Sequence, residues 1–315
     1  MFYRLIKLLI RATCFLFCKQ IRIINQSHLN QKGPLLIVAN HPNSFLDAIL
    51  IAALCKYPIH FFARGDAFQQ KKYRIILRLF NMMPIYRLSE GKENLYLNEF
   101  SFKESNQILA SGGIVLIFIE GICINNHELQ PFKKGTARIA LMAETSEPLY
   151  VLPVAITYNS FTKFGKTVII EAAKPILVNQ LFPYDDEAHN YLNFNSNIRP
   201  IIQQMIHWPI IEEETSNKYL NIIANFGRLL HYPLYKLISN FVKAKTKGTV
   251  FYDSVLFSVL LIAYPVYLLA IAGVIFYLSK SLLLIIGVVA THLFLAKAAV
   301  LHQKNKRLLN TNSFT

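Results

Sequence analysis

The sequence predicts an α/β domain with a mostly parallel, mixed sheet and flanking helices, joined to an N-terminal interfacial helix and a C-terminal transmembrane hairpin. Short apolar runs alternate with helical stretches over residues 33–180, which is typical of a largely parallel sheet. Two uncharged apolar runs follow, at 254–279 and 281–296. The predicted division of the chain is therefore 1–24 for the interfacial helix, 25–250 for the α/β domain, 251–303 for two transmembrane helices and 304–315 for a basic polar tail.

The chain is both basic and apolar. Its 315 residues carry 33 Lys and Arg against 18 Asp and Glu, a formal net charge of +15, and 53% are hydrophobic. A basic chain favours an acidic partner, and we expect an anionic membrane or a phosphorylated substrate. Nucleic acid is not expected, because the sequence has neither zinc-finger spacing nor an RNA-binding signature. The four cysteines include no CxxC pair and are predicted to be reduced thiols of a cytosol-facing protein.

Residues 1–24 predict an amphipathic helix that lies in the membrane interface. Leu, Ile and Phe cover one face, and this pattern would turn the basic face towards lipid phosphates. The segment is unlike a signal peptide, because charges interrupt the apolar run and no small-residue cleavage site follows. The alternative is an amphipathic helix packed on the α/β domain. The basic stripe consists of Arg4, Lys7, Arg11 and Arg22.

The alternating region can be divided into individual elements. The predicted strands are 35–39, 59–63, 83–87, 114–119, 149–157 and 167–171, and the predicted helices are 45–54, 71–80, 94–110 and 136–144. Pro153 interrupts its strand, which argues for an edge strand or a bulge. Residues 181–250 predict further helices with breaks at Pro183, Pro200, Pro209 and Pro233.

The two C-terminal apolar runs predict a hairpin of membrane-spanning helices. The first run is long enough to cross a bilayer, and the second reaches about 20 residues if Lys297 snorkels. Pro265 predicts a kink in the first helix. Both ends of the hairpin carry lysine or arginine, so the positive-inside rule puts these flanks and the α/β domain in the cytoplasm. The alternatives are helices buried in a soluble core and a re-entrant or interfacial pair. The flanking cations are Lys243, Lys245, Lys247, Lys297, Lys304, Lys306 and Arg307.

The stretch Asn-His-Pro-Asn-Ser-Phe-Leu-Asp at 40–47 lies between a predicted strand and a predicted helix. His41 and Asp47 therefore come at the carboxyl end of a strand, the edge where open α/β sheets bind ligands. A histidine oriented by an aspartate can take a proton from a hydroxyl near neutral pH. The alternative is a histidine at a helix start and a solvated acid in the first turn.

Three later stretches extend this pattern: Ile85-Tyr86-Arg87, Phe118-Ile119-Glu120-Gly121 and Val151-Leu152-Pro153-Val154. With the His/Asp turn, in this order, they resemble the four blocks of the glycerolipid acyltransferases, the family of lysophosphatidic acid and glycerol-3-phosphate acyltransferases. Those blocks are a His-x4-Asp box, a strand ending in Arg, a Phe-Pro-Glu-Gly-Thr-Arg box and a Val-Pro-Val-like strand. The stretch at 132–137 resembles the family's basic loop and following helix, and the resemblance covers 33–180, about half of the chain.

The sequence departs from the family pattern at two places. Five residues, rather than four, separate His41 from Asp47. A subgroup of glycerol-3-phosphate acyltransferase relatives shares this spacing. Ile122 and Cys123 stand where the family has Thr and Arg, which removes one expected phosphate-binding arginine and puts the identity of the acceptor in doubt.

The resemblance implies the fold and the reaction of these enzymes. A fatty acyl group would pass from acyl-CoA or acyl carrier protein to the hydroxyl of a lysophospholipid, first of all 1-acylglycerol 3-phosphate, giving phosphatidic acid. Glycerol 3-phosphate or a lyso-aminolipid is the second choice of acceptor. Rival classes are a membrane lipid-binding protein with an idle site and a thioester hydrolase. No cofactor or metal is expected, because the histidines form no HExxH motif or Cys/His cluster.

Catalysis would fall to the His/Asp turn. His41 would deprotonate the acceptor hydroxyl, which attacks the thioester carbonyl, and Asp47 would orient His41. No acyl-enzyme is expected, so Cys55 and Cys123 are predicted to be structural thiols.

Substrate binding would fall to the later blocks. Arg87 would grip a phosphate with its planar guanidinium, while Lys133 and Lys134 would act as point charges. Gly121 would let the backbone approach the ligand, and Glu120 would hold the site loops through hydrogen bonds. The alternative for the three cations is a solvated surface position.

Overall fold

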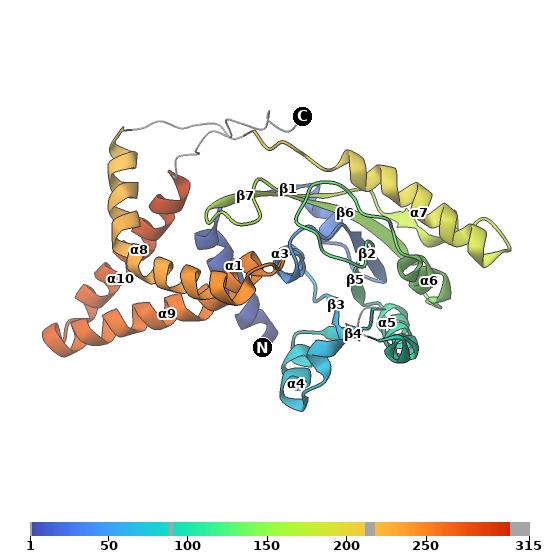
Figure 1. The fold of residues 1–315 in the computed structure, drawn as a ribbon, viewed down its shortest axis with the longest axis horizontal. Helices are drawn as coiled ribbons and strands as arrows, with labels where there is room; N and C mark the ends of the chain where they lie inside the picture. The colour runs from blue at the N-terminus through green and yellow to red at the C-terminus, as the bar shows by residue number, and fades with distance from the viewer. Residues whose placement is uncertain (1, 88–90, 212–217, 303–315) are drawn as a thin grey trace.

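The computed structural model describes residues 2–87, 91–211 and 218–302, and its centre is an eight-stranded mixed sheet (Figure 1). The strand order is β1-β7-β6-β2-β5-β3-β4, and β8 pairs with β6. The strands are β1 (Cys18–Ile24), β2 (Leu35–Ala39), β3 (His60–Arg64), β4 (Met82–Ile85), β5 (Ile114–Phe118), β6 (Tyr150–Tyr158), β7 (Lys166–Ala172) and β8 (Ile176–Leu177).

The pairing confirms a mostly parallel, mixed sheet. Strands β6, β2, β5, β3 and β4 run parallel, β7 and β8 are antiparallel to β6, and β1 is parallel to β7. The carboxyl ends of β2, β5, β3 and β4 therefore meet at one edge of the sheet. That edge positions the site.

Helices cover both faces of the sheet (Figure 1). They are α1 (Phe2–Phe17), α2 (Gln26–Leu29), α3 (Phe45–Leu54), α4 (Lys71–Leu79), α5 (Asn98–Ala110), α6 (Lys134–Met142), α7 (Glu187–Gln204), α8 (Lys218–Thr246), α9 (Tyr252–Ser279) and α10 (Leu282–Leu301). The four helices predicted within the alternating region correspond to α3, α4, α5 and α6, and a short 3-10 helix (Lys92–Leu97) precedes α5.

The core has two parts, one on each face. Leu35, Ile37 and Ala39 of β2 pack with buried residues of α1, α3, α8 and α9. Leu36 and Val38 face the other way and pack with α5, α6 and α7. Such burial on both faces explains why the strands of a parallel sheet appear as continuous apolar runs.

The prediction of one helix over residues 1–24 is wrong at its C-terminal end. Helix α1 ends at Phe17, and Cys18–Ile24 form β1 at the edge of the sheet, beside β7. Ile21 and Ile23 pack on the core while Gln20 and Arg22 are exposed. This alternation has the period of a strand, so Arg22 does not belong to a helical stripe.

Two basic residues of α1, Lys7 and Arg11, contact a different partner from the one predicted, while the side chain of Arg4 lies outside the described part of the chain. The Lys7 ammonium donates to the carbonyl of Cys55, and Arg11 Nε donates to the carbonyl of Ala53 at 2.7 Å. Both carbonyls lie at the C-terminal end of α3, where unpaired acceptors and the helix dipole favour a cation. Lys7 and Arg11 therefore bind protein rather than lipid phosphates, as in the alternative of a helix packed on the domain. Leu5 and Leu8 are 67% and 62% exposed.

Two predicted helix breaks are absent, because Pro200 lies inside α7 and Pro233 inside α8, both on exposed positions. Water can satisfy the carbonyl that each proline leaves unpaired. Pro153 lies in the interior strand β6, so the prediction of an edge strand is wrong. Its carbonyl accepts from the N–H of Ala173, on the side where β6 changes its partner from β8 to β7. The missing N–H donor of Pro153 falls on this side, where the ladder passes from one partner strand to the other.

The two long C-terminal helices are present. By length and composition, α9 and α10 are each able to cross a membrane. Lys297 of α10, whose snorkelling would lengthen the second run to about 20 residues, donates to the carbonyls of Phe15 at 2.7 Å and Cys18 at 3.1 Å, at the end of α1. Pro265 lies inside α9. Of the predicted flanking cations, Lys304, Lys306 and Arg307 lie outside the described residues, as does the predicted tail at 304–315.

Candidate active site

The His/Asp turn follows directly from the end of β2. Asn40 fixes its start, because the side-chain amide donates to the carbonyl of Ile156 at 3.0 Å and accepts from the N–H of the same residue at 2.8 Å. A side-chain amide thus takes the place of a backbone group in the ladder between β2 and β6. The chain then leaves the sheet and begins α3 at Phe45.

His41 and Asp47 form a hydrogen-bonded pair. His41 Nδ1 lies 2.9 Å from Asp47 Oδ2, and the side chain of Asp47 is fully buried while that of His41 is 15% exposed. A carboxylate only accepts, so the proton lies on Nδ1 and Nε2 is left as the free acceptor. The imidazole stacks on Phe118 of β5, with ring centroids 3.9 Å apart and planes 9° apart. Nε2 therefore has the chemistry and the fixed orientation of a general base.

Two further donors hold Asp47. The backbone N–H of Asn43 donates to Oδ2 at 2.8 Å, and the hydroxyl of Tyr158 donates to Oδ1 at 2.7 Å. Burial, together with the charge of Asp47, raises the pKa of Tyr158 well above its ordinary value, so the phenol stays a neutral donor. Sequence reasoning missed Tyr158, although it directly follows the predicted strand 149–157.

Glu120 connects the turn to a second loop. Its Oε1 accepts from the N–H of His41 at 3.0 Å, and its Oε2 accepts from the N–H of Gln130 at 3.1 Å. Burial raises the pKa of this carboxyl, and the two N–H donors oppose that shift. These contacts place Glu120 where it was predicted to hold the site loops.

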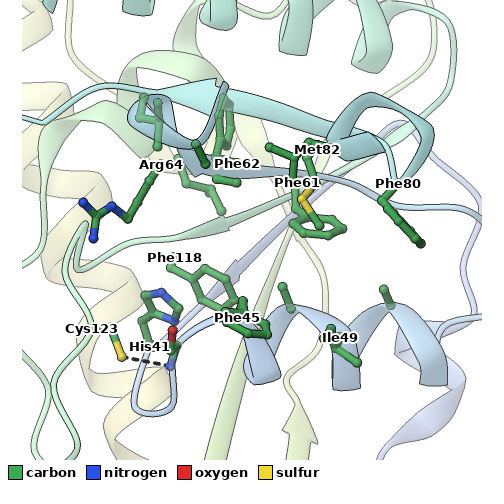
Figure 2. Close-up of a pocket in the computed structure, with 18 of the residues that line it drawn as sticks. His41, Phe45, Ile49, Phe61, Phe62, Arg64, Phe80, Met82, Phe118 and Cys123 are labelled. Atoms are coloured by element: carbon green, nitrogen blue, oxygen red, sulfur yellow. Dashed lines mark hydrogen bonds between the residues drawn. The ribbon is translucent and has the colours of Figure 1, made fainter. Parts of the chain in front are cut away.

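His41 lines a cavity of about 1670 Å³. In Figure 2, His41, Cys123 and Arg64 lie towards one side of the view, and the apolar side chains of Phe45 and Ile49 follow along α3. The apolar lining comes from α1, α3, β3, α4 and the segment that enters α9. One continuous space therefore has a reactive polar region and a long apolar wall.

Most of the predicted binding residues line this cavity. Arg87, Gly121 and Lys133 contribute to its wall, whereas Lys134 is exposed at the start of α6 and does not. Arg87 lies just beyond β4 rather than at its last residue. The side chain of Asn98 holds this segment by bonding the N–H and the carbonyl of Tyr86, at 2.8 and 2.9 Å.

Arg64 is a lining residue that sequence reasoning missed. It ends β3, the neighbour of β4, and pairs with Asp66 through Nε and Oδ1 at 3.1 Å. The sequence could have indicated Arg64, because it directly follows the predicted strand 59–63, much as Arg87 ends the predicted strand 83–87.

Cys123 supports the turn from the position where the family has arginine. The N–H of Ser44 donates to its sulfur, as the dashed line in Figure 2 marks. Ser44 has a φ of 54°, a conformation that costs a non-glycine residue energy unless its surroundings hold it. Burial raises the pKa of the Cys123 thiol to about 12, so the sulfur is neutral near pH 7. All four cysteines are free thiols.

Two residues of α9 also reach the turn, and neither was predicted. Asp253 accepts from the side chain of Asn43 at 2.7 Å, and Ser254 accepts from the N–H of Leu46 at 3.0 Å. Across residues 2–87, 91–211 and 218–302, no group of three or more His, Cys, Asp or Glu side chains is arranged to hold a metal ion.

Residues 20–157 match the family described as Acyltransferase. No curated protein matches the chain. Among solved structures, the chain is similar to the crystal structure of the 1-acyl-sn-glycerophosphate (LPA) acyltransferase PlsC from Thermotoga maritima. The identity is 18% and the TM-score 0.48, with 65% of this chain and 78% of that chain covered.

Proposed function

We propose that this chain, whose residues 20–157 match the family described as Acyltransferase, is a membrane-bound O-acyltransferase that makes phosphatidic acid. It would transfer a fatty acyl group from acyl-CoA or acyl carrier protein to the free hydroxyl of 1-acylglycerol 3-phosphate. The observation that carries the proposal is that His41, cationic side chains and a long apolar wall all line one continuous cavity.

The His/Asp pair supplies the proton transfer. Nε2 of His41 takes the proton of the acceptor hydroxyl as its oxygen attacks the thioester carbonyl carbon. Asp47 holds the ring and stabilises the imidazolium that forms. The tetrahedral intermediate then collapses, the carbon–sulfur bond breaks, and the imidazolium returns the proton to the departing thiolate. The products are an ester and a free thiol, and His41 is again neutral.

The remaining lining suits the two substrates. Acyl chains would lie on the apolar wall along α3, where burial of each CH₂ contributes about 0.8 kcal/mol. The acceptor phosphate would lie near Arg87 and Lys133, with Arg87 as the bidentate partner. Gly121 has a φ of 63° and forms the tight turn beside Lys133, so the chain can pass close to the ligand there.

Membrane attachment fits substrates that reside in a bilayer. Helices α9 and α10 are long and apolar enough to span it, and α1 presents exposed leucines beside them. Residues of α1 and of the segment entering α9 line the cavity, which favours entry of lipid from the membrane side. We place the α/β domain in the cytoplasm by the positive-inside rule.

The test is an assay of the purified, detergent- or nanodisc-reconstituted full chain with one labelled acyl donor and a panel of acceptors, read by product mass. Phosphatidic acid from 1-acylglycerol 3-phosphate is expected, and His41→Ala should lower its rate by about 10²–10⁴-fold, the usual contribution of a general base. If glycerol 3-phosphate or a lyso-aminolipid were acylated instead, that molecule would be the acceptor in place of 1-acylglycerol 3-phosphate. Release of free fatty acid without a lipid product would indicate a hydrolase. No turnover of any donor would indicate a lipid-binding protein.

A further inference from the structure

The first turn of α9 is bonded to the catalytic turn at three points. Oδ2 of Asp253 accepts from the side-chain amide of Asn43 at 2.7 Å. Oγ of Ser254 accepts from the N–H of Leu46 at 3.0 Å and donates to the carbonyl of Asn43, also at 3.0 Å. Both the side chain and the carbonyl of Asn43 are thus held by a helix that begins more than 200 residues later in the chain.

Asp253 is itself held by a buried cation. Its carboxylate pairs with the ammonium of Lys166, at the start of β7, and both side chains are almost completely buried. Burying an ion pair is seldom the most stable solution, because well-packed apolar residues of similar volume often serve as well or better. Fixing α9 on the sheet does not require these charges. Their position suggests that they fix the direction of the Asp253 carboxylate.

Asn43, the residue held by α9, bonds directly to the aspartate of the His/Asp pair. The N–H of Asn43 donates to Oδ2 of Asp47 at 2.8 Å, the same oxygen that faces Nδ1 of His41. Ser44, the next residue, has a φ of 54°. A turn that contains such a residue keeps its shape only when its neighbours hold it. The bonds from α9 therefore fix the peptide whose N–H orients Asp47.

We propose that Asp253, fixed by Lys166, is a positioning residue of the acyltransferase site, so that the first turn of a membrane helix completes the catalytic turn. The proposal rests on the proposed function. It extends the site beyond residues 20–157 to the C-terminal hairpin. Asp253 acts through Asn43 and Asp47 and does not touch the substrate.

The test compares two double variants that both remove the buried charges. Lys166→Met with Asp253→Asn leaves an amide oxygen that can accept from Asn43. Lys166→Met with Asp253→Leu leaves no acceptor. Because neither variant buries a lone charge, both avoid the large destabilisation that follows from breaking one side of an ion pair. Tyr277→Ala, at an 83% exposed position near the far end of α9, is the control for changes within that helix.

The expected result is a fall in kcat of about 100-fold in the leucine variant, the scale of a small misplacement of catalytic groups. Its KM for the acyl donor should change little, and the asparagine variant and Tyr277→Ala should stay close to wild type. Hydrogen exchange of the peptide covering 40–50 is measured on the same preparations, and it should accelerate in the leucine variant alone. The amount of each variant in the membrane fraction and its thermal unfolding show whether the protein is folded.

Equal kcat and equal exchange in the two double variants would overturn the proposal, because the acceptor at 253 would then have no role in the turn. Failure of the proposed function would look different. Wild type would transfer no acyl group to any acceptor, and the exchange comparison alone would decide whether Asp253 positions the turn.

Discussion

The phenol of Tyr158 lies 2.7 Å from Oδ1 of Asp47, within the buried core of the sheet. The carboxylate therefore has a donor on each oxygen, with His41 and the N–H of Asn43 at Oδ2. Because burial raises the pKa of this phenol, it remains protonated over the whole physiological range. The tyrosine thus stabilises Asp47 as an anion and fixes its rotation.

Tyr158→Phe should lower both stability and turnover. The change keeps the ring and removes one hydrogen bond to a charged acceptor, which contributes about 1.5–3 kcal/mol. We expect a lower unfolding temperature and a loss of kcat of roughly tenfold or more, at nearly unchanged KM for the acyl donor. Thermal unfolding and steady-state kinetics measure the two effects. A variant with wild-type kcat would show that His41 and Asn43 suffice to orient Asp47.

The alternation of apolar runs predicted the sheet because fully buried strands such as β2 have little choice of side chain. The same reasoning failed at Cys18–Ile24. There a short strand continues a helix, and the spacing of Arg22 from Arg11 happens to fit a helical stripe. Lys7 and Arg11 show a related limit. A basic face looks the same in the sequence whether it meets lipid phosphates or the carbonyls at the end of α3.

The site was predictable where its chemistry is local. His41 and Glu120 come just after strands whose carboxyl ends share one edge, and Asp47 lies in the first turn of the helix that follows, so position and residue type together indicate their chemistry. Asp253 and Lys166 were not predictable, because a pair of charges distant in the sequence gives no periodic signal. Asp253 directly precedes an uncharged run, where an acid is easily taken for the solvated start of a helix.

Cys123 should behave as a structural thiol. Since its pKa is raised to about 12, the thiolate fraction stays small at neutral pH and grows only as the pH approaches that value. Its alkylation by a small maleimide should therefore keep accelerating above pH 8.5, where an ordinary thiol levels off. Cys123→Ser should retain most of the activity. Labelled acyl groups found covalently bound to Cys123 during turnover would contradict this assignment.

The turn at Lys280 should lie on the opposite side of the membrane from the α/β domain. A cysteine introduced by Lys280→Cys should react with a membrane-impermeant maleimide only from the outer side, because two spanning helices return the chain to its starting side. The matched control is Leu192→Cys, at a 69% exposed position of α7, which should react only from the cytoplasmic side. Labelling of both positions from one side would indicate a re-entrant or interfacial pair instead.

Phosphate recognition can be assigned by comparing three cations. Arg87 and Lys133 line the cavity with His41, whereas Lys134 is exposed outside it. With Ile122 and Cys123 in the third block, no arginine from that block is available for the acceptor phosphate. Arg87→Ala should lower kcat/KM for a phosphate-bearing acceptor by roughly 10–150-fold, since hydrogen bonds to charged groups contribute about 1.5–3 kcal/mol.

The lysines should differ from Arg87 and from each other. Lys133→Ala should have a smaller effect, because an ammonium offers a point charge and not a planar fork. Lys134→Ala serves as the matched control and should stay near wild type. Acceptor kinetics at saturating donor measure the effects of the three variants. The kcat/KM for the acyl donor should not decrease in the order in which the kcat/KM for the acceptor does. Unchanged acceptor kinetics in Arg87→Ala would exclude it as the phosphate ligand. If Lys133→Ala were also unaffected, neither residue would bind an acceptor phosphate, and a lyso-aminolipid would become the better substrate to test.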